Sequence, residues 1–444
     1  MGNVISSSQG RADGGRGMRF RTLTEWLRWQ EGLHFTAIEL GLDRCRKVAE
    51  KMDLLRPSFT VISVAGTNGK GSCAAMLESI FRQSGYKVGC YTSPHLQRYN
   101  ERIRIDGEEV TDAMLCRSFA RIDRARGNIS LTYFEFGTLA AIDLFHQAGI
   151  DIAVMEVGLG GRLDAVNMLD ADVALISTID LDHETWLGHD REHIGREKAG
   201  IFRPMRPAIC ADPEPPASIR AAVEMVGARY YQAGREFLVE TGAGGWSWRS
   251  GLSCYENLPV PGGSEFQVRN AAGVLMVLHA LSDRFPVEAG TIFRCLRDFT
   301  LPGRFQQVEG RVPLILDVAH NRQAAAILAE NLRARPCQGR NLAVTGMLAD
   351  KDHGAFFSSL APLVHDWFLA TLHHERGADH AHLVTALYAV DPEARCDTFD
   401  LVGEALDAAW REARPGDRIL VTGSFLTVGA ALRWLESGGR DHGA

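Results

Sequence analysis

The segment Ala65–Ser72, with the sequence Ala-Gly-Thr-Asn-Gly-Lys-Gly-Ser, has the composition of a loop that binds phosphate. It follows an apolar, β-branched run at 57–65, which predicts a buried strand, and precedes 73–81, which predicts a helix. Glycines let backbone N–H groups turn toward phosphate oxygens, and the helix N-terminus adds the positive end of its dipole. Lys70 would neutralise the terminal phosphates of ATP. We therefore predict a nucleotide site formed by Gly66, Thr67, Asn68, Gly69, Lys70, Gly71 and Ser72.

This loop departs from the usual Walker pattern at two positions. Val64 stands where that pattern needs its first glycine, and Gly71 follows Lys70 where the pattern has serine or threonine. A Gly-rich turn with an exposed Lys70 is therefore the alternative interpretation.

Other polar residues have types that suit a metal-assisted reaction on phosphate. Glu156 ends an apolar run, and ligands of open α/β sheets bind beyond the carboxyl ends of strands, so Glu156 could hold magnesium against ATP. A solvated strand-end acid or a helix N-cap is the alternative. Ser93 could reach the same ion, or it could be a simple turn hydroxyl. His183 is an unusual magnesium ligand and, taken alone, reads as a loop histidine, while Lys198 reads as a surface lysine on a helix.

The loop variant Gly-Thr-x-Gly-Lys resembles the ATP loop of the Mur ligase superfamily, and its full form is similar to the folate branch of that superfamily. Further segments match the branch in order, and together they are highly specific: 91–96, 132–138, 156–165, 182–183, 195–202, 302–304, 316–321 and 422–424. The resemblance implies an ATP-dependent ligase that joins L-glutamate to dihydropteroate and to the γ-carboxylate of folates through an acyl phosphate.

The same resemblance assigns roles to individual residues. It implies that Ser93 and Glu156 hold one magnesium ion, that His183 and Glu156 hold a second, and that Lys198 is catalytic and carbamylated; a monovalent cation is left open. A buried lysine loses its proton more readily and can attack carbon dioxide, which gives this modification a chemical basis. The residues that reach ATP from elsewhere are Asn270, Arg304, Asp317 and His320. The residues on the pterin side are Thr36, Ile38, Thr132, Tyr133, Phe134, Glu135, Leu163, Asp164 and Ala165.

Two of these assignments keep a plainer alternative. The segment 132–135 has aromatic residues that can stack on a flat ring, but it also fits an amphipathic helix with an aromatic core. Arg304 could clamp phosphate oxygens or be a linker charge.

Length and strand rhythm predict the architecture. A chain of 444 residues exceeds a single core, and continuous apolar strands that alternate with helices indicate parallel sheets covered on both faces. We predict an α/β protein with a P-loop-type, mainly parallel N-terminal domain and a smaller Rossmann-like C-terminal domain. Residues 241–251 suggest a hairpin or loop. The predicted boundaries are a disordered extension at 1–19, the ATP-binding domain at 20–299, a linker at 300–311 and the C-terminal domain at 312–444.

Composition limits the partners. The chain has 48 Lys and Arg against 55 Asp and Glu, so no basic field would recruit nucleic acid, and no apolar run is long enough for a membrane span. The nine cysteines include no CxxC pair, which favours a reducing compartment, the cytoplasm. The start 1–6 matches a myristoylation pattern, but a disordered extension is the preferred interpretation. We expect His373, His374, His380 and His382 to lie in an exposed loop, and the resemblance implies a monomer.

Two other functions compete with folate ligation. A muramyl-peptide ligase would share the chemistry but take nucleotide-linked substrates, and Gly71 with segment 132–135 favours folate over it. A P-loop kinase or a regulatory ATP-binding module would bind ATP without releasing phosphate in a glutamate-dependent way.

Overall fold

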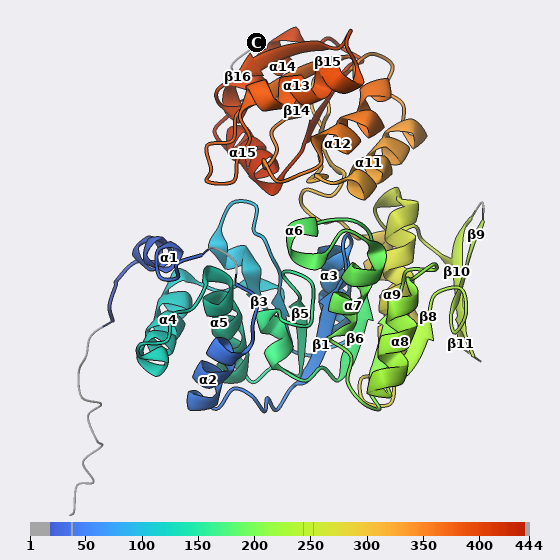
Figure 1. Cartoon of the computed structure of the whole chain (residues 1–444). Helices are drawn as coiled ribbons and strands as arrows, with labels where there is room; N and C mark the ends of the chain where they lie inside the picture. The colour runs from blue at the N-terminus through green and yellow to red at the C-terminus, as the bar shows by residue number, and fades with distance from the viewer. Residues whose placement is uncertain (1–17, 37–38, 243, 252, 440–444) are drawn as a thin grey trace, which may run out of the picture.

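The computed structural model describes residues 18–36, 39–242, 244–251 and 253–439. The myristoylation pattern, almost all of the predicted N-terminal extension, and Ile38 therefore lie outside the described residues. Figure 1 shows two α/β domains stacked along the long axis, an N-terminal domain with β1 to β11 and a C-terminal domain with β12 to β17. This arrangement confirms the predicted fold class.

The N-terminal domain is built on an eight-stranded sheet. Six adjacent strands are parallel, and two short antiparallel strands extend one edge. Strand β1 is buried along its whole length, because helices cover both faces. In spatial order the strands are β4 (Glu108–Glu109), β3 (Ile103–Ile105), β2 (Val88–Tyr91), β5 (Ile152–Glu156), β1 (Thr60–Ala65), β6 (Val173–Ile176), β7 (Pro207–Cys210) and β8 (Arg229–Gln232).

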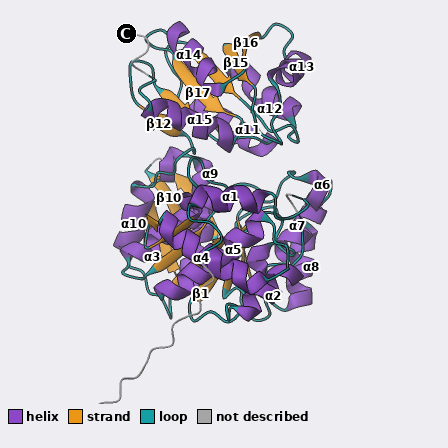
Figure 2. Cartoon of the chain, turned by 90° about the vertical axis from the view of Figure 1, so that its left-hand side faces the viewer, coloured by secondary structure: helices purple, strands orange, loops and turns teal. Residues whose placement is uncertain are grey.

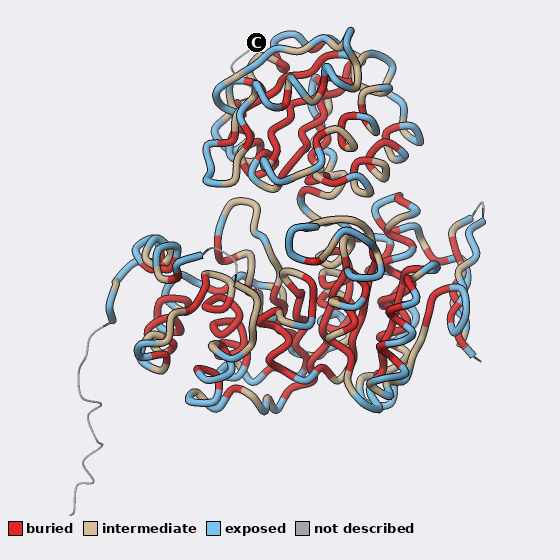
Figure 3. The backbone as a smooth tube through the Cα atoms, in the orientation of Figure 1, coloured by how far each residue is buried: buried red, intermediate tan, exposed pale blue. Residues whose placement is uncertain are grey.

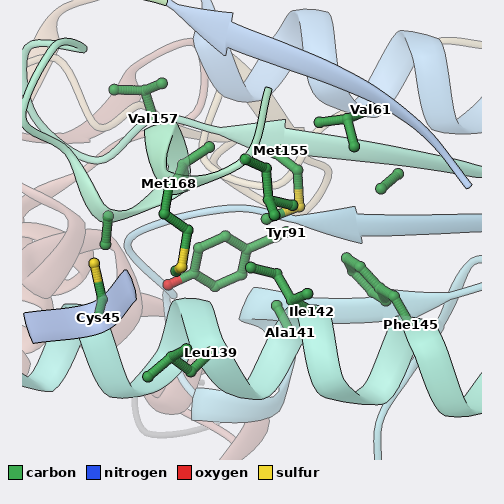
Figure 4. Close-up of a cluster of buried hydrophobic side chains, with 14 of the residues drawn as sticks. Cys45, Val61, Tyr91, Leu139, Ala141, Ile142, Phe145, Met155, Val157 and Met168 are labelled. Atoms are coloured by element: carbon green, nitrogen blue, oxygen red, sulfur yellow. The ribbon is translucent and has the colours of Figure 1, made fainter. Parts of the chain in front are cut away.

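Alternate residues of β1 point into two separate cores. Val61 belongs to the core on one face of the sheet and Ile62 to the core on the other. Figure 4 shows part of the first core, where Tyr91 at the end of β2 lies between Ile142 and Met168. The helices on this face are α1 (Leu23–Glu31), α2 (Asp43–Lys51), α4 (Asp112–Arg126), α5 (Tyr133–Ala148), α7 (Arg191–Ala199) and α8 (Ala217–Val226). Those on the opposite face are α3 (Lys70–Gln83), α9 (Glu265–Ala280) and α10 (Ala289–Arg297).

A separate antiparallel sheet extends the N-terminal domain. It contains β9 (Leu238–Gly242), β10 (Gly245–Ser250) and β11 (Ser253–Leu258). Of the two structures predicted for 241–251, a hairpin or a loop, the hairpin is the one formed. Trp246 and Trp248 anchor this sheet in the second core.

The C-terminal domain has a six-stranded sheet that is parallel except for its edge strand β12. In spatial order it contains β12 (Gln306–Val308), β13 (Leu314–Leu316), β17 (Arg418–Thr422), β14 (Asn341–Thr345), β15 (Asp366–Ala370) and β16 (Arg395–Phe399). The helices that cover its two faces are α11 (Arg322–Ala334), α12 (His353–Leu360) and α13 (His380–Val390) on one, and α14 (Val402–Glu412) and α15 (Phe425–Glu436) on the other. Strand β12 lies inside the range 300–311 that the sequence predicts as a linker.

Helices lie on both faces of the two large sheets (Figure 2), and the central strands of these sheets form the buried interior (Figure 3), whereas β9 and β11 are largely exposed. Among the described residues, no helix combines the length and the apolar character that a membrane crossing requires.

Candidate active site

The loop between β1 and α3 needs glycine at two positions. Gly66 has φ 151°, and a Cβ there would lie 1.9 Å from the Ser177 Oγ. Gly69 has φ 90°, in the left-handed region that side chains rarely adopt. The loop therefore passes close to the end of β6 and then turns sharply into α3.

The segment after β6 holds this loop in place. The Thr67 N–H donates to the Thr178 carbonyl at 2.8 Å, and the Thr67 hydroxyl donates to the Asp180 carbonyl at 2.9 Å. The Lys70 ammonium folds back over the loop and donates to the carbonyls of Gly66 and Thr67 at 3.0 and 3.2 Å. Desolvation lowers the pKa of Lys70 below its ordinary value, although Glu156 and Asp182 oppose this shift. Lys70 thus faces the inside of a cavity and is not the exposed lysine of the alternative interpretation.

Glu156 ends β5 beside this loop. Its side chain is buried, and its Oε2 accepts a hydrogen bond from the Ser93 N–H at 3.2 Å. A Cβ on Gly71 would lie 3.7 Å from the same oxygen, so the carboxylate faces the first turn of α3. Burial raises the pKa of Glu156, while Lys70 and the Ser93 hydrogen bond oppose that shift. The structure therefore brings Ser93, Glu156 and the phosphate loop together.

His183 and Lys198 reach the same cavity from the other side of the loop. His183 precedes α6 (Glu184–Leu187) with φ 53°, and burial lowers its pKa to about 3, so its imidazole is neutral near pH 7. Lys198, in the last turn of α7, is only 3% exposed, which contradicts its interpretation as a surface lysine. Burial, and secondarily Lys70, lower the pKa of Lys198 to about 7. Within the described part of the chain, its amine has neither a hydrogen bond nor an ion pair.

The wall further from the loop begins at the N-terminus of α5. Thr132 caps this helix in a capping box with Glu135, whose Oε2 accepts from the Thr132 N–H at 2.8 Å. Tyr133 and Phe134, in the first turn, line the cavity. Segment 132–135 is thus a helix start and a cavity wall at once.

Asp164 and its neighbours complete that wall. Asp164 is buried and accepts hydrogen bonds from the N–H groups of Leu159 and Val166 at 2.8 and 2.9 Å. Burial raises the pKa of Asp164 to about 7. Thr36, Leu163 and Ala165 line the cavity as well.

The C-terminal domain contributes Arg304, Asp317 and His320. The two Asp317 carboxylate oxygens accept from the N–H groups of Phe305 and Ala319, each at 2.8 Å, which fixes the end of β13 against the connection between the domains. Burial raises the pKa of Asp317, and the nearby Arg304 opposes this.

Asn270 is the predicted nucleotide residue that the structure places differently. It is fully buried in α9 and does not line the cavity. A Cβ on Gly69 would lie 2.3 Å from its Oδ1, so Asn270 contacts the loop from behind.

These residues surround one cavity of about 1470 Å³ between the two domains. It joins the phosphate loop, the carboxylate of Glu156 and the aromatic wall of Tyr133, so a nucleotide and a flat ring can occupy it together. The sequence alone did not predict the contacts that join the two domains beside this cavity. Asn321, which caps α11, exchanges hydrogen bonds with Asn68 of the loop at 3.2 Å.

A buried ion pair also joins the two domains. The Lys351 ammonium lies 2.6 Å from Asp182 Oδ1, and the two side chains are only 5% and 10% exposed. Asn321 Nδ2 donates to the other Asp182 oxygen at 2.9 Å. Although burial alone would raise it, the pKa of Asp182 is lowered by the neighbouring His183 and Lys351.

We expect Lys351→Met to lower the free energy of unfolding by about 3 kcal/mol, because it leaves a buried carboxylate without its cation. Urea titration measures the loss. The double variant Asp182→Asn/Lys351→Met should recover much of it, since no unpaired charge remains; additive losses would contradict the pairing.

The four-histidine prediction needs a correction. His373 and His374 are exposed in a loop, but His380 and His382 lie in the first turn of α13, where Asp379 caps the helix. The segment therefore becomes helical where a loop was expected, because its aspartate supplies an N-cap.

Comparison with known proteins agrees with this geometry. The Mur ligase middle domain family matches residues 64–234, and the family described as "Mur ligase, glutamate ligase domain" matches 303–425. A dihydrofolate synthase/folylpolyglutamate synthase of Escherichia coli is 45% identical over 421 residues, which cover 94% of this chain and 97% of that protein. The Haemophilus influenzae protein of the same description is 41% identical and covers 91% and 96%.

Solved structures agree as well. E. coli FolC in complex with DHPP and ADP superposes with a TM-score of 0.90 at 44% identity, covering 94% of this chain and 99% of that one. A bifunctional folylpolyglutamate synthase/dihydrofolate synthase with Mn, AMPPNP and L-glutamate bound has a TM-score of 0.87 at 45% identity, covering 94% and 98%. The family models, the relatives and the solved structures agree along nearly the whole chain. The chain therefore belongs to the dihydrofolate synthase/folylpolyglutamate synthase family of Mur ligases.

Proposed function

We propose that this protein uses ATP to join L-glutamate to dihydropteroate, giving dihydrofolate, and to the γ-carboxylate of folates. One observation carries the proposal: a single cavity is lined by the phosphate loop, by Glu156 with Ser93, and by the aromatic wall at Tyr133 and Phe134. Relatives with this fold have been solved with DHPP and ADP, and with Mn, AMPPNP and L-glutamate, which supports the proposal.

The reaction has two steps. A carboxylate oxygen of the acceptor attacks the γ-phosphorus of ATP, the bond to ADP breaks, and an acyl phosphate forms. The glutamate amine then attacks the acyl carbon, the tetrahedral intermediate expels phosphate, and the amine loses its proton as the amide forms. Lys70 and Arg304 stabilise the transferring phosphoryl group, Asp317 and His320 complete the nucleotide site, and Asn270 supports the phosphate loop from behind. Catalysis rests on positioning and fixed charges.

The residues present fit a divalent cation. Glu156 and Ser93 supply oxygen ligands and His183 a neutral imidazole, with Ser93 and Glu156 proposed for one magnesium ion and His183 and Glu156 for a second. Within the described residues, no three His, Cys, Asp or Glu side chains are grouped to hold an ion. A bound divalent ion would offset phosphate charge; a monovalent cation beside it, and carbamylated Lys198, belong to the same proposal.

Several further assignments accompany this function. The pterin ring is proposed to bind at Thr36, Ile38, Thr132 to Glu135 and 163–165. We also propose a cytoplasmic monomer without nucleic-acid or membrane partners, and the domain boundaries 1–19, 20–299, 300–311 and 312–444.

An ADP-release assay tests the function. Purified protein receives ATP and magnesium with dihydropteroate, tetrahydrofolate or a nucleotide-linked muramyl precursor, each with and without L-glutamate. We expect ADP release that depends on L-glutamate with the first two acceptors, and a mass gain of one glutamyl residue in each product.

Two results would contradict the proposal. Turnover with the muramyl precursor alone would identify a muramyl-peptide ligase. ATP binding without glutamate-dependent ADP release would identify a regulatory module.

A further inference from the structure

Four arginines line the cavity: Arg102, Arg304, Arg335 and Arg376. Arg376 forms an ion pair with Asp350, and Arg335 donates to two backbone carbonyls of the loop before α9 at 3.0 and 2.6 Å. Neither Arg102 nor Arg304 has a carboxylate within 4.0 Å among the residues that the structure describes. Because Arg304 is already proposed to bind phosphate, Arg102 remains as a cavity cation with no assigned anion.

Arg102 is held rigidly. Strand pairing sets Tyr91 opposite Ile103, and the Thr92 N–H donates to the Arg102 carbonyl at 2.9 Å. Its Nε donates to His95 Nδ1 at 2.8 Å. No described residue hydrogen-bonds its two terminal nitrogens, so the outer edge of the guanidinium is available to a ligand.

Two aromatic rings lie beside this guanidinium. Its central carbon lies 5.4 Å from the ring centroid of Tyr99 and 5.5 Å from that of Tyr133. An arginine that is held by two aromatic contacts and by a hydrogen bond from its Nε presents a preorganised fork that matches a carboxylate.

The location of Arg102 indicates which carboxylate this is. One neighbour, Tyr133, belongs to the aromatic wall, and Thr92, paired with Arg102, is adjacent to Ser93 beside Glu156. Arg102 therefore lies along the path from the ring pocket to the reacting centre. Dihydropteroate brings one carboxylate, which reacts, whereas the terminal glutamyl unit of a folate brings a second, its α-carboxylate, which does not.

We propose that Arg102 binds the α-carboxylate of the terminal glutamyl residue of folate substrates and thereby positions their γ-carboxylate for phosphorylation. This inference rests on the proposed function. It makes Arg102 a specificity residue for chain extension that dihydropteroate does not need.

The test compares three acceptors in wild type and Arg102→Ala: dihydropteroate, tetrahydropteroylglutamate and tetrahydropteroyl-γ-aminobutyrate, which keeps the reacting carboxylate but lacks the α-carboxylate. We expect Arg102→Ala to raise the KM for tetrahydropteroylglutamate about 10- to 100-fold, the loss typical of a charged hydrogen-bonded pair. The KM for dihydropteroate should change little, and the preference of wild type for the glutamyl substrate over its analogue should disappear.

Two further variants sharpen the comparison. Arg98→Ala is the matched control, because Arg98 is on the same segment, its side chain is 64% exposed in a 3.9 Å pair with Glu109, and it does not line the cavity. It should behave like wild type. Arg102→Lys keeps the charge but loses the fork, and should recover part of the preference; it also serves if Arg102→Ala folds poorly.

An equal loss toward dihydropteroate and tetrahydropteroylglutamate in both Arg102 variants, or an unchanged preference over the analogue, would overturn the inference and leave the proposed function standing. A wild-type protein without glutamate-dependent turnover of any acceptor would instead remove the proposed function, and the inference with it.

Discussion

Replacing Lys70 with alanine is expected to lower kcat about 10²- to 10³-fold, the loss typical of removing one preorganised charge from a transition state. Lys70 starts α3, its ammonium folds over the loop carbonyls, and Glu156 interacts with it electrostatically. It is therefore placed to neutralise charge on a transferring phosphoryl group. Glutamate-dependent ADP release measures the effect.

The fold should survive this change, because a desolvated ammonium is removed and no carboxylate among the residues that the structure describes forms an ion pair with it. We expect an unchanged circular dichroism spectrum. Lys47→Ala is the control, since Lys47 is exposed on α2 and does not line the cavity. Full turnover in Lys70→Ala would disprove the role assigned to the phosphate loop.

Replacing Lys198 with alanine is expected to lower kcat about 10²-fold or more if the side chain carries a carbamate that acts as a fixed charge. Burial lowers the pKa of this amine to about 7, so much of it is neutral near pH 7 and can attack carbon dioxide. Activation by bicarbonate should therefore rise with pH through about 7, as the amine loses its proton. A ¹³C carbamate resonance in protein incubated with labelled bicarbonate, lost in Lys198→Ala, reports the adduct directly.

Stability offers an independent readout for Lys198. Between its folded pKa of about 7 and its higher unfolded pKa, the unfolded state binds more protons, so this residue makes stability increase as pH rises through that range. Lys198→Met should abolish that contribution. An unmodified amine in fully active protein would refute the carbamate.

Local signals accounted for most of the fold. The strand before Gly66 and the helix after Lys70 could be predicted because each is encoded by a pattern of apolar residues within one continuous segment. Glu156 could be placed because the carboxyl ends of parallel strands share one edge of a sheet.

The remainder depended on pairing across long distances in the chain. Nothing near Asp182 or Lys351 indicates that they meet, because the two residues are 169 positions apart in the sequence and belong to different domains. The sequence also does not predict that Arg102 lines the cavity, since the position of Arg102 follows from the register of β3 against β2. Asn270 was expected to reach ATP, and only the packing of α9 behind the loop shows where its side chain lies.

The aromatic wall on α5 and the carboxylate at the end of β5 belong to the same densely packed N-terminal domain. The distance between the ring pocket and the reacting centre is therefore constant. With the proposed substrates, each added γ-glutamyl residue lengthens the acceptor, while the distance from the ring pocket to the reacting centre stays the same. A longer folate must then bend or withdraw its ring from the pocket to present its end. The affinity of that pocket for the ring, and not the chemistry of ligation, would then determine the length at which chain growth stops.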